Sequence, residues 1–182
     1  SDNEILYSVI SVINSNCVIP LFSSLNPTLN FVPGQMEGFP LPKDFLIRKG
    51  DYSKNGVELI GISKLDWDSS ELSWGFKHFP LAKFANESLE VAYIKLRDSR
   101  KTTINHVKKL EEDNNRTFID AYMLQGEVQA AVPLSKITLF CNPYYKYGGD
   151  KSEQEVDELL RADTMREFIS YSVGCMFGRY SL

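Results

Sequence analysis

The chain has 182 residues, of which 43% are hydrophobic, 12% aromatic and 24% charged, and its net charge is −4. This composition excludes a disordered chain, and the length supports one ordinary hydrophobic core or two small ones. The acidic balance gives no sign of a free-standing nucleic-acid binder, which is usually basic because phosphate contacts supply most of its affinity. It leaves room for a local basic patch.

The cysteine pattern and the chain ends set the expected compartment. Cys17, Cys141 and Cys175 are odd in number, far apart and in no CxxC pattern, which favours a reduced, cytoplasmic setting. The sequence has no signal peptide and no apolar run long enough to cross a bilayer, so no membrane partner is expected. The chain lacks an initiator Met and stops in an apolar segment, and we therefore expect a fragment of a longer polypeptide.

The first 43 residues predict two short helices and a loop. An apolar stripe behind Asp2 predicts a helix that residues 14–16 interrupt, because Asp is a good N-cap and Asn-Ser-Asn favours turns. A second helix is expected to follow, with Pro20 in its first turn, and to end near Leu25. Closely spaced Pro and Gly residues predict a loop from Thr28 to Lys43.

The middle of the chain carries the clearest predicted element. Residues 44–65 have apolar positions with helical spacing, although three glycines argue against a helix. Residues 66–81 predict a loop with a short helical turn. From Asn86, as the N-cap, to about Leu124, apolar residues recur at helical spacing, and Gly126 is a natural stop. This long helix is expected to act as a strut.

The last third predicts a connector followed by two helices. Residues 132–140 predict one strand or an extended connector. Ser152 and Glu155 form a capping-box pattern at the start of a helix. Asp163 is expected to cap a second helix over residues 164–177. The predicted fold class is therefore mainly α, an irregular helical spacer with long helices and minor extended segments.

One short stretch resembles an active-site motif. Asn142-Pro143-Tyr144-Tyr145 differs by one residue from the Asn-Pro-Pro-Tyr of amino-group DNA methyltransferases. In those enzymes the motif follows a buried strand, with a Gly-rich cofactor loop upstream, and no GxG occurs in this chain. We therefore interpret residues 142–145 as a turn into the Ser152 helix, with Gly148-Gly149 making the bend.

No other pattern predicts catalysis or metal binding. His78 and His106 have no partners at ligand spacing, and the pair Glu111-Glu112 is expected on a solvated helix face. No nucleophile elbow or phosphate-binding lysine loop is present. No catalytic, cofactor-binding or metal-binding residue is therefore predicted. Trp67, Trp74, Phe76 and Phe79 suit either stacking on bases or anchoring an irregular segment, and we favour anchoring.

Basic residues provide the candidates for contacts with the DNA backbone. They occur as pairs or short clusters, each close to acidic residues, so that surface solubility is the competing explanation. The candidates are Arg48, Lys49, Arg97, Arg100 and Lys101.

Several blocks resemble a known family. ISYSVGCMFGRYSL at residues 169–182, WDSSELSW at 67–74 and RTFIDAYMLQGEV at 116–128 are similar to blocks of the PglX-type adenine-specific DNA methyltransferases. These belong to the BREX phage-exclusion systems and are related to type IIG restriction–modification enzymes. The start of the chain, with its NPTLNF block, resembles the tail of their target-recognition domains. The chain departs from the pattern at Gly75, where the family usually has Asp, and at Met123, where it usually has Gly.

The resemblance implies a role within a larger enzyme. It implies a parent that binds S-adenosylmethionine and carries its catalytic motif upstream, that acts on double-stranded DNA, and that works with other defence-system subunits. Residues 1–43 would be the tail of a target-recognition-type domain, and residues 44–182 a helical spacer region. This segment itself is expected to hold no cofactor.

Three functions stay open from the sequence. The first is a non-catalytic spacer that positions the catalytic and recognition parts on DNA. The second is a helical adaptor that docks a partner defence subunit through a face with Met165, Phe168 and Met176. The third is an autonomous methyltransferase that uses Asn142.

Overall fold

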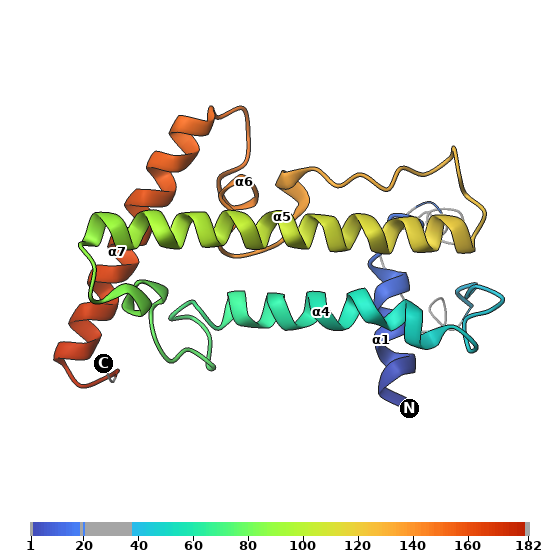
Figure 1. Ribbon diagram of the computed structural model, residues 1–182, viewed down its shortest axis with the longest axis horizontal. Helices are drawn as coiled ribbons and strands as arrows, with labels where there is room; N and C mark the ends of the chain where they lie inside the picture. Colours follow the sequence, from blue (N-terminus) through green and yellow to red (C-terminus); the bar gives the residue numbers. More distant parts are fainter. Residues whose placement is uncertain (1, 19, 21–37, 181–182) are drawn as a thin grey trace. The chain divides into compact units, whose positions relative to one another are not determined.

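The computed structural model describes residues 2–18, 20 and 38–180. Their secondary structure is almost entirely helical, and within these residues there is no strand, only an isolated bridge between Gln125 and Val128. The prediction of a mainly α fold is therefore confirmed. The elements are α1 (Asp2–Ile13), α4 (Lys49–Trp67), η1 (Pro80–Phe84), α5 (Leu89–Ala121), η2 (Leu134–Lys136), α6 (Pro143–Tyr147) and α7 (Glu153–Met176) (Figure 1).

The chain forms two compact units, each built from two stretches of sequence. The first unit comprises Ser1–Ile60 and Lys109–Val132, and the second comprises Gly61–Lys108 and Pro133–Leu182. Helices α4 and α5 contribute residues to both. The predicted boundary between a recognition-domain tail and a spacer at residue 44 stays a prediction, because residues 21–37 lie outside the described part. The predicted second helix and the NPTLNF block also fall largely there.

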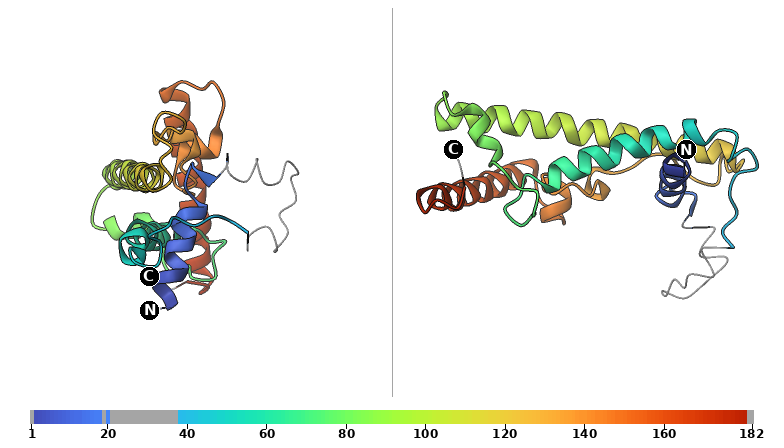
Figure 2. Two further views of the ribbon diagram at one scale, coloured as in Figure 1. Left: turned by 90° about the vertical axis from the view of Figure 1, so that its right-hand side faces the viewer. Right: turned by 90° about the horizontal axis from the view of Figure 1, so that it is seen from below.

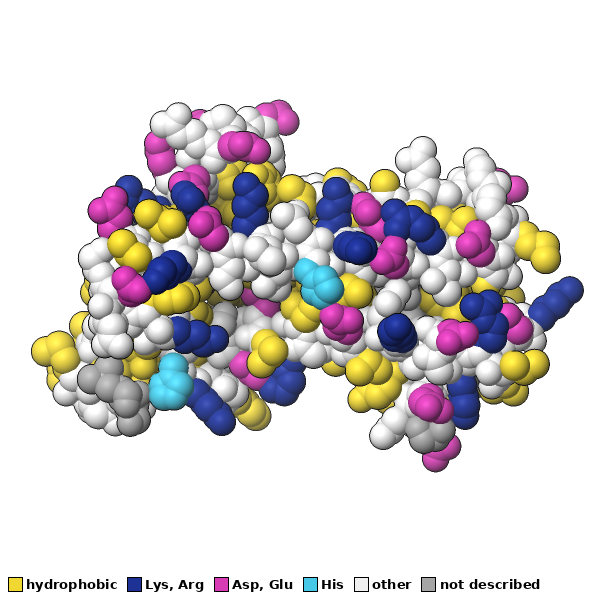
Figure 3. Space-filling view, in the orientation of Figure 1, with side chains coloured by type: hydrophobic (Ala, Val, Ile, Leu, Met, Phe, Trp, Pro, Cys, Tyr) yellow, Lys and Arg dark blue, Asp and Glu magenta, His cyan; other side chains and the backbone are white. Residues whose placement is uncertain are grey.

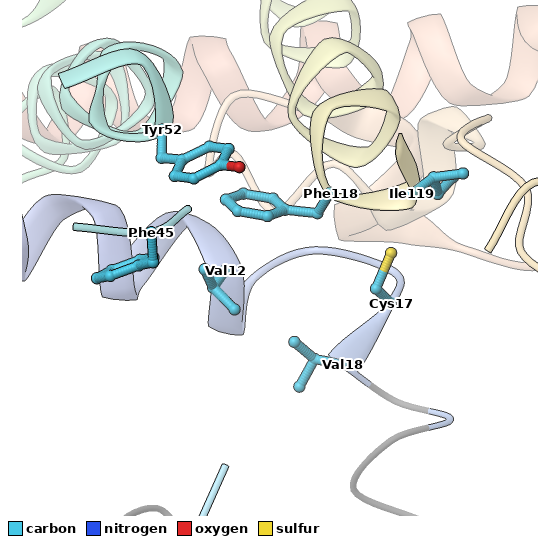
Figure 4. Close-up of a cluster of buried hydrophobic side chains, with 7 residues drawn as sticks. All are labelled: Val12, Cys17, Val18, Phe45, Tyr52, Phe118 and Ile119. Atoms are coloured by element: carbon cyan, nitrogen blue, oxygen red, sulfur yellow. The ribbon is translucent and has the colours of Figure 1, made fainter. Parts of the chain in front are cut away.

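The first unit has an aromatic core at the C-terminal end of α5. Tyr52 and Phe118 pack with ring centroids 5.1 Å apart, and Phe45 stacks on Tyr52 at 6.1 Å. Figure 4 shows these rings together with the side chains that α1 and the following turn supply. The full cluster is Val12, Cys17, Val18, Phe45, Tyr52, Phe118 and Ile119.

Two buried asparagines of α5 tie the first unit together. Asn114 donates to the carbonyl of Ser11, with 2.9 Å between the atoms. Asn115 accepts from the backbone N–H of Asn16 at 2.9 Å and donates to the carbonyl of Ala130 at 3.0 Å. Buried polar side chains are stabilising when they are hydrogen-bonded in this way, because they satisfy backbone groups that water cannot reach.

Helix α4 includes Gly50, Gly56 and Gly61, the three glycines whose low helix propensity argued against a helix here. A side chain at Gly56 would collide with the side chain of Ser11 and come within 3.3 Å of the carbonyl of Tyr7. The missing side chain lets α1 approach α4 closely, so the gain in packing offsets the low helix propensity of glycine.

The second unit has its own core, to which α7 and the start of α5 contribute. Phe79 and Leu81 come from the segment before α5, which holds the predicted short helical turn as η1, and Tyr171 comes from α7. The rings of Phe79 and Tyr171 lie 6.0 Å apart. The buried members are Phe79, Leu81, Ala92, Leu96 and Tyr171.

Helix α5 is one continuous helix of 33 residues, seen along its axis on the left of Figure 2. The predicted N-cap Asn86 is wrong, because residues 85–87 continue in turns after η1. Ser88 takes that place: its Oγ accepts from the N–H of Val91 at 3.3 Å. The turns of η1 therefore delay the start of α5 by two residues.

The C-terminal end of α5 has the two hydrogen bonds of a Schellman motif. The N–H of Leu124 donates to the carbonyl of Ile119, and the N–H of Met123 donates to that of Asp120. Met123 has φ 57°, in the left-handed region that favours glycine. The expected stop at Gly126 is therefore wrong by three residues, and the turn lies where the resembling family usually has glycine.

Replacing Met123 with Gly is expected to raise the free energy of unfolding of the first unit by about 0.5–1 kcal/mol, because glycine adopts a positive φ without strain. The Met123 side chain is 84% exposed, so little packing is lost. Met123→Ala keeps the Cβ atom and is the matched control, expected to leave stability unchanged. Hydrogen exchange of the α1 and α5 amides measures the effect, and an equal gain from both substitutions would contradict it.

Helix α7 is a single helix rather than the two predicted. Its capping box is present as expected, with Ser152 and Glu155 each accepting from the other's backbone N–H. The predicted cap at Asp163 is wrong. The Asp163 carboxylate instead accepts from the hydroxyl of Tyr147 at 2.8 Å and pairs with Lys146 at 3.0 Å. These partners from α6 engage the carboxylate that capping would have used, so the helix continues.

Candidate functional site

Asn142 is an internal anchor of the segment that joins η2 to α6. Its side chain is fully buried, and its Oδ1 accepts from the N–H of Tyr144 at 3.1 Å. Its Nδ2 donates to the carbonyls of Leu134 at 2.8 Å and Ile137 at 2.7 Å. Of the two alternatives predicted for residues 132–140, the strand is absent and the stretch is a connector that contains η2. Where a turn was predicted, Asn142 caps the one-turn helix α6, and both of its side-chain polar atoms are engaged with the chain's own backbone.

The segment after Asn142 also follows the predicted path. Pro143 begins α6, where its missing N–H does no harm, and Gly148 and Gly149 both have positive φ. The chain bends there and enters α7 at the Ser152 capping box.

The acidic residues of the WDSSELSW region hold other segments of the second unit. The Asp66 carboxylate accepts from the backbone N–H groups of Phe140 and Cys141. Burial, followed by the charge of Asp66, raises the pKa of the Cys141 thiol. Ser170 of α7 donates to the carboxylate of Glu71 at 2.7 Å. These carboxylates therefore organise the backbone and α7.

The glycine-containing signature at the end of α7 packs against the same region. The ring of Tyr180 stacks on Tyr171 at 5.4 Å and meets the edge of Phe76 at 5.1 Å. A Cβ atom at Gly174 would lie 2.6 Å from the Tyr180 ring. Gly178, with φ 72°, ends the helix, and the N–H of Arg179 donates to the carbonyl of Gly174 at 2.8 Å. The signature is thus a helix end that places Tyr180.

The four aromatic residues of residues 67–79 are anchors only in part. Phe79 is buried, and Phe76 packs against Tyr171 and Tyr180. Trp67 is half exposed, with its ring edge-on to Phe140, and Trp74 is fully exposed. The expectation that all four are buried anchors is therefore wrong for Trp67 and Trp74.

The pair Glu111-Glu112 is not on a solvated face, contrary to expectation. Burial raises the pKa of Glu111 to about 7. The side chain of Glu112 is 18% exposed, pairs with Arg116 at 3.6 Å and accepts from the N–H of Val132 at 3.2 Å. Glu112 therefore ties the segment that follows α5 back onto the helix.

Two of the five basic candidates lie in the first unit and have internal partners. The Arg48 guanidinium pairs with Asp44 and Asp51, each at 3.4 Å, and lies over the ring of Tyr52. Lys49 pairs with Glu4 at 3.6 Å and its side chain is 31% exposed. Both cations would have to leave these partners to bind a phosphate.

The other three candidates come together at a pocket of the second unit, which we call the α5–α7 pocket. Arg97 pairs with Asp98 at 3.4 Å and Asp157 at 3.6 Å, and Arg100 donates to Thr164 at 3.2 Å. Lys101 is exposed and forms no ion pair in the described part of the chain. The pocket has a volume of about 390 Å³, and its walls include Arg97, Arg100, Lys101, Asn105, Pro143, Tyr144, Glu153 and Asp157.

Sequence reasoning missed the residues that complete this pocket. Burial, then the charges of Glu153 and Asp157, raise the pKa of Tyr144. The spacing 97, 100, 101 and 105 indicates one face of a helix, but only the tertiary structure brings Tyr144 and α7 to that face.

A second concave site of the second unit is apolar. This groove, of about 480 Å³, lies among η1, the start of α5 and the end of α7. Phe168 and Met176, from the predicted docking face, line it, whereas Met165 packs against the core. Met176 and Phe177 are exposed by 85% and 87%. The predicted face is therefore divided between core and surface.

Residues 2–18, 20 and 38–180 contain no group of three or more side chains that could hold a metal ion. None of the described helices is long and apolar enough to cross a membrane.

The whole chain is similar to a segment of two curated adenine-specific methyltransferases. It is 33% identical over 187 residues to BrxX of Escherichia coli O9:H4 (strain HS). It is 30% identical over 190 residues to PglX of Lacticaseibacillus casei (strain Zhang). Each match covers 100% of this chain and 14% of the relative. No protein-family model matches the chain.

The structure is mainly helical, and the two matches make the chain methyltransferase-related. The chain spans about one seventh of the length of these curated relatives. Both relatives are adenine-specific methyltransferases of the BREX type, and this chain is similar to an internal segment of each. The resemblance predicted from the SVGCMFGRYSL and WDSSELSW blocks is therefore confirmed.

Proposed function

We propose that this chain is a non-catalytic helical spacer segment of an adenine-specific DNA methyltransferase in a bacterial phage-defence system. It positions the catalytic and recognition parts of the longer protein on double-stranded DNA. The cofactor, S-adenosylmethionine, belongs to the catalytic part rather than to this segment. The polar groups of its Asn-Pro-Tyr-Tyr stretch are engaged in holding its own backbone, which supports a non-catalytic role.

The observation that carries the proposal is the construction of α5. Its start supplies Ala92 and Leu96 to the core of the second unit, and its end supplies Phe118 and Ile119 to the core of the first. A helix of 33 residues is about 50 Å long, at about 1.5 Å per residue. An element of this length with a core at each end suits a spacer.

Contacts with DNA would come from the side of α5 that carries Lys101, which is exposed, and Arg97 and Arg100, which are half-buried. Figure 3 shows Lys and Arg side chains interleaved with Asp and Glu side chains along α5. This mixed surface fits a few positioning contacts with phosphates rather than a strongly basic cleft. Lys101 is the strongest single candidate, because no internal ion pair competes for it.

Replacing Lys101 with Gln in the full-length protein is expected to weaken duplex DNA binding and to make it less sensitive to salt. Loss of one phosphate contact lowers the slope of log K against log salt by about 1, so a fourfold rise in salt costs roughly threefold less affinity. A DNA-binding titration at several salt concentrations measures this slope. Lys109→Gln is the matched control, an exposed lysine on another side of α5, expected to leave the slope unchanged.

The apolar groove favours a second candidate function, a helical adaptor that docks a partner defence subunit. Its lining and the exposed Met176 and Phe177 would suit a nonpolar helix of that subunit. In that case Lys101→Gln leaves DNA binding unchanged, whereas Phe177→Ser weakens the association with the subunit. An unchanged salt slope for Lys101→Gln would contradict the DNA contact proposed here.

A further inference from the structure

The α5–α7 pocket combines a basic wall, an aromatic wall and an acidic wall in one concave site. Its volume of about 390 Å³ lies within the range of roughly 300–1,000 Å³ that small-molecule sites occupy. We infer that this pocket binds one unstacked nucleotide, with the phosphate on Arg100 and Lys101 and the base against Tyr144. The inference rests on the proposed function as far as the nucleotide belongs to DNA.

The basic wall has donors to spare for a phosphate. Lys101 is exposed and unpaired in the described part of the chain. Arg100 donates to Thr164 through Nη1, and a guanidinium has five N–H donors, so others are left for an anion. Arg97 is shared between Asp98 and Asp157, and it therefore orients the wall more than it attracts the ligand.

The aromatic wall is held in place before any ligand arrives. The backbone N–H of Tyr144 donates to Asn142, and Asn142 is itself fixed to two carbonyls of the connector. The Tyr144 ring and Pro143 line the pocket beside each other. Nucleobases stack on aromatic side chains irrespective of base identity, so a preset ring is a suitable platform. Asn142 would thus act as a positioning residue for Tyr144.

The acidic wall excludes two simpler ligands. Glu153 and Asp157 of α7 line the pocket together with the cations of α5, and Asp157 pairs with Arg97 at 3.6 Å. Asn105 adds an amide. Carboxylates repel a bare phosphate anion, whereas they accept hydrogen bonds from the amino and hydroxyl groups of a nucleoside. An apolar peptide would cover the Glu153 carboxylate without offering it a side-chain donor. A ligand with an anionic end and a hydrogen-bonding aromatic end matches all three walls.

The test compares two DNA duplexes on the full-length protein. One duplex carries a single unpaired 2-aminopurine nucleotide, and the other is fully paired. We expect the bulged duplex to bind on the order of 10-fold more tightly, since stacking one base on an aromatic ring has an effect of this size. The fluorescence of 2-aminopurine should fall on binding. Tyr144→Ala should remove the preference and the fluorescence change, and Tyr144→Phe, which keeps the ring, should preserve both.

The outcomes separate the pocket from the proposed function. Equal behaviour of Tyr144→Ala and Tyr144→Phe, with the salt slope intact, overturns the pocket and leaves the spacer function standing. Absence of salt-dependent DNA binding by the unmodified protein counts against the spacer function. In that case a titration with free dAMP decides: binding that Tyr144→Ala weakens about 10-fold supports a free nucleotide as ligand, and no binding overturns the inference. Urea unfolding of each variant verifies that it is folded.

Discussion

Replacing Asn142 with Asp is expected to lower the free energy of unfolding of the second unit by about 2–4 kcal/mol. The substitution keeps the size of the side chain and the oxygen that accepts from Tyr144. It removes both N–H donors, so the carbonyls of Leu134 and Ile137 lose their partner at a fully buried position. It also places a negative charge next to those carbonyl oxygens.

Urea unfolding followed by tryptophan fluorescence measures this loss, because Trp67 and Trp74, the two tryptophans of the chain, both lie in the second unit. Asn86→Asp is the matched control: Asn86 is exposed in the same unit, and its exchange should change stability by less than about 0.5 kcal/mol. A methyltransferase motif accepts either Asn or Asp, so the substitution also separates the two roles. A small effect of Asn142→Asp would contradict the anchoring role.

Replacing Gly174 with Ala is expected to destabilise the second unit by about 1–3 kcal/mol, the usual range for overpacking. The added methyl group would lie 2.6 Å from the Tyr180 ring, so that ring must leave its contacts with Phe76 and Tyr171. The same urea titration reports the change, because these residues all belong to the second unit.

Gly61→Ala is the matched control for Gly174→Ala. Gly61 lies in α4 with no atom within 4 Å of an added Cβ, so alanine should stabilise by about 0.5–1 kcal/mol through its higher helix propensity. In a Tyr180→Ala background the cost of Gly174→Ala should nearly vanish, because the colliding ring is gone. Similar effects of the two glycine substitutions, or an unchanged cost in the Tyr180→Ala background, would refute the close contact.

The contacts made by the family blocks show what these blocks do in this segment. Asp66, just before WDSSELSW, accepts from the backbone of the connector, and Glu71, within that block, accepts from Ser170. The signature at the end of α7 places Tyr180 near Glu71. Two blocks that are distant in sequence therefore meet in the second unit. Their roles are structural, which agrees with the proposal that chemistry occurs elsewhere in the longer protein.

The sequence predicted the features that depend on neighbouring residues. The first helix ends at Ile13, just before the Asn-Ser-Asn turn, and the Ser152 capping box is formed, since both use contacts within a few residues. The turn at Asn142 and the glycine bend follow from the backbone preferences of Asn, Pro and Gly. Five basic residues were proposed as a group, but their spacing alone did not show which of them share a site.

Tertiary contacts decided the remaining features. Partners from α6 occupy the carboxylate of Asp163, so Asp163 caps no helix. The turns after η1 move the N-cap of α5 from Asn86 to Ser88.

The sequence by itself thus determined the helical class, the resemblance to the family and several helix ends, because local hydrogen bonds and short motifs specify them. The tertiary structure alone decided that Asn142 is buried, that Gly174 makes room for Tyr180, and that Arg100, Lys101 and Tyr144 line one pocket. Those properties depend on contacts between residues far apart in the chain, and no local pattern encodes them.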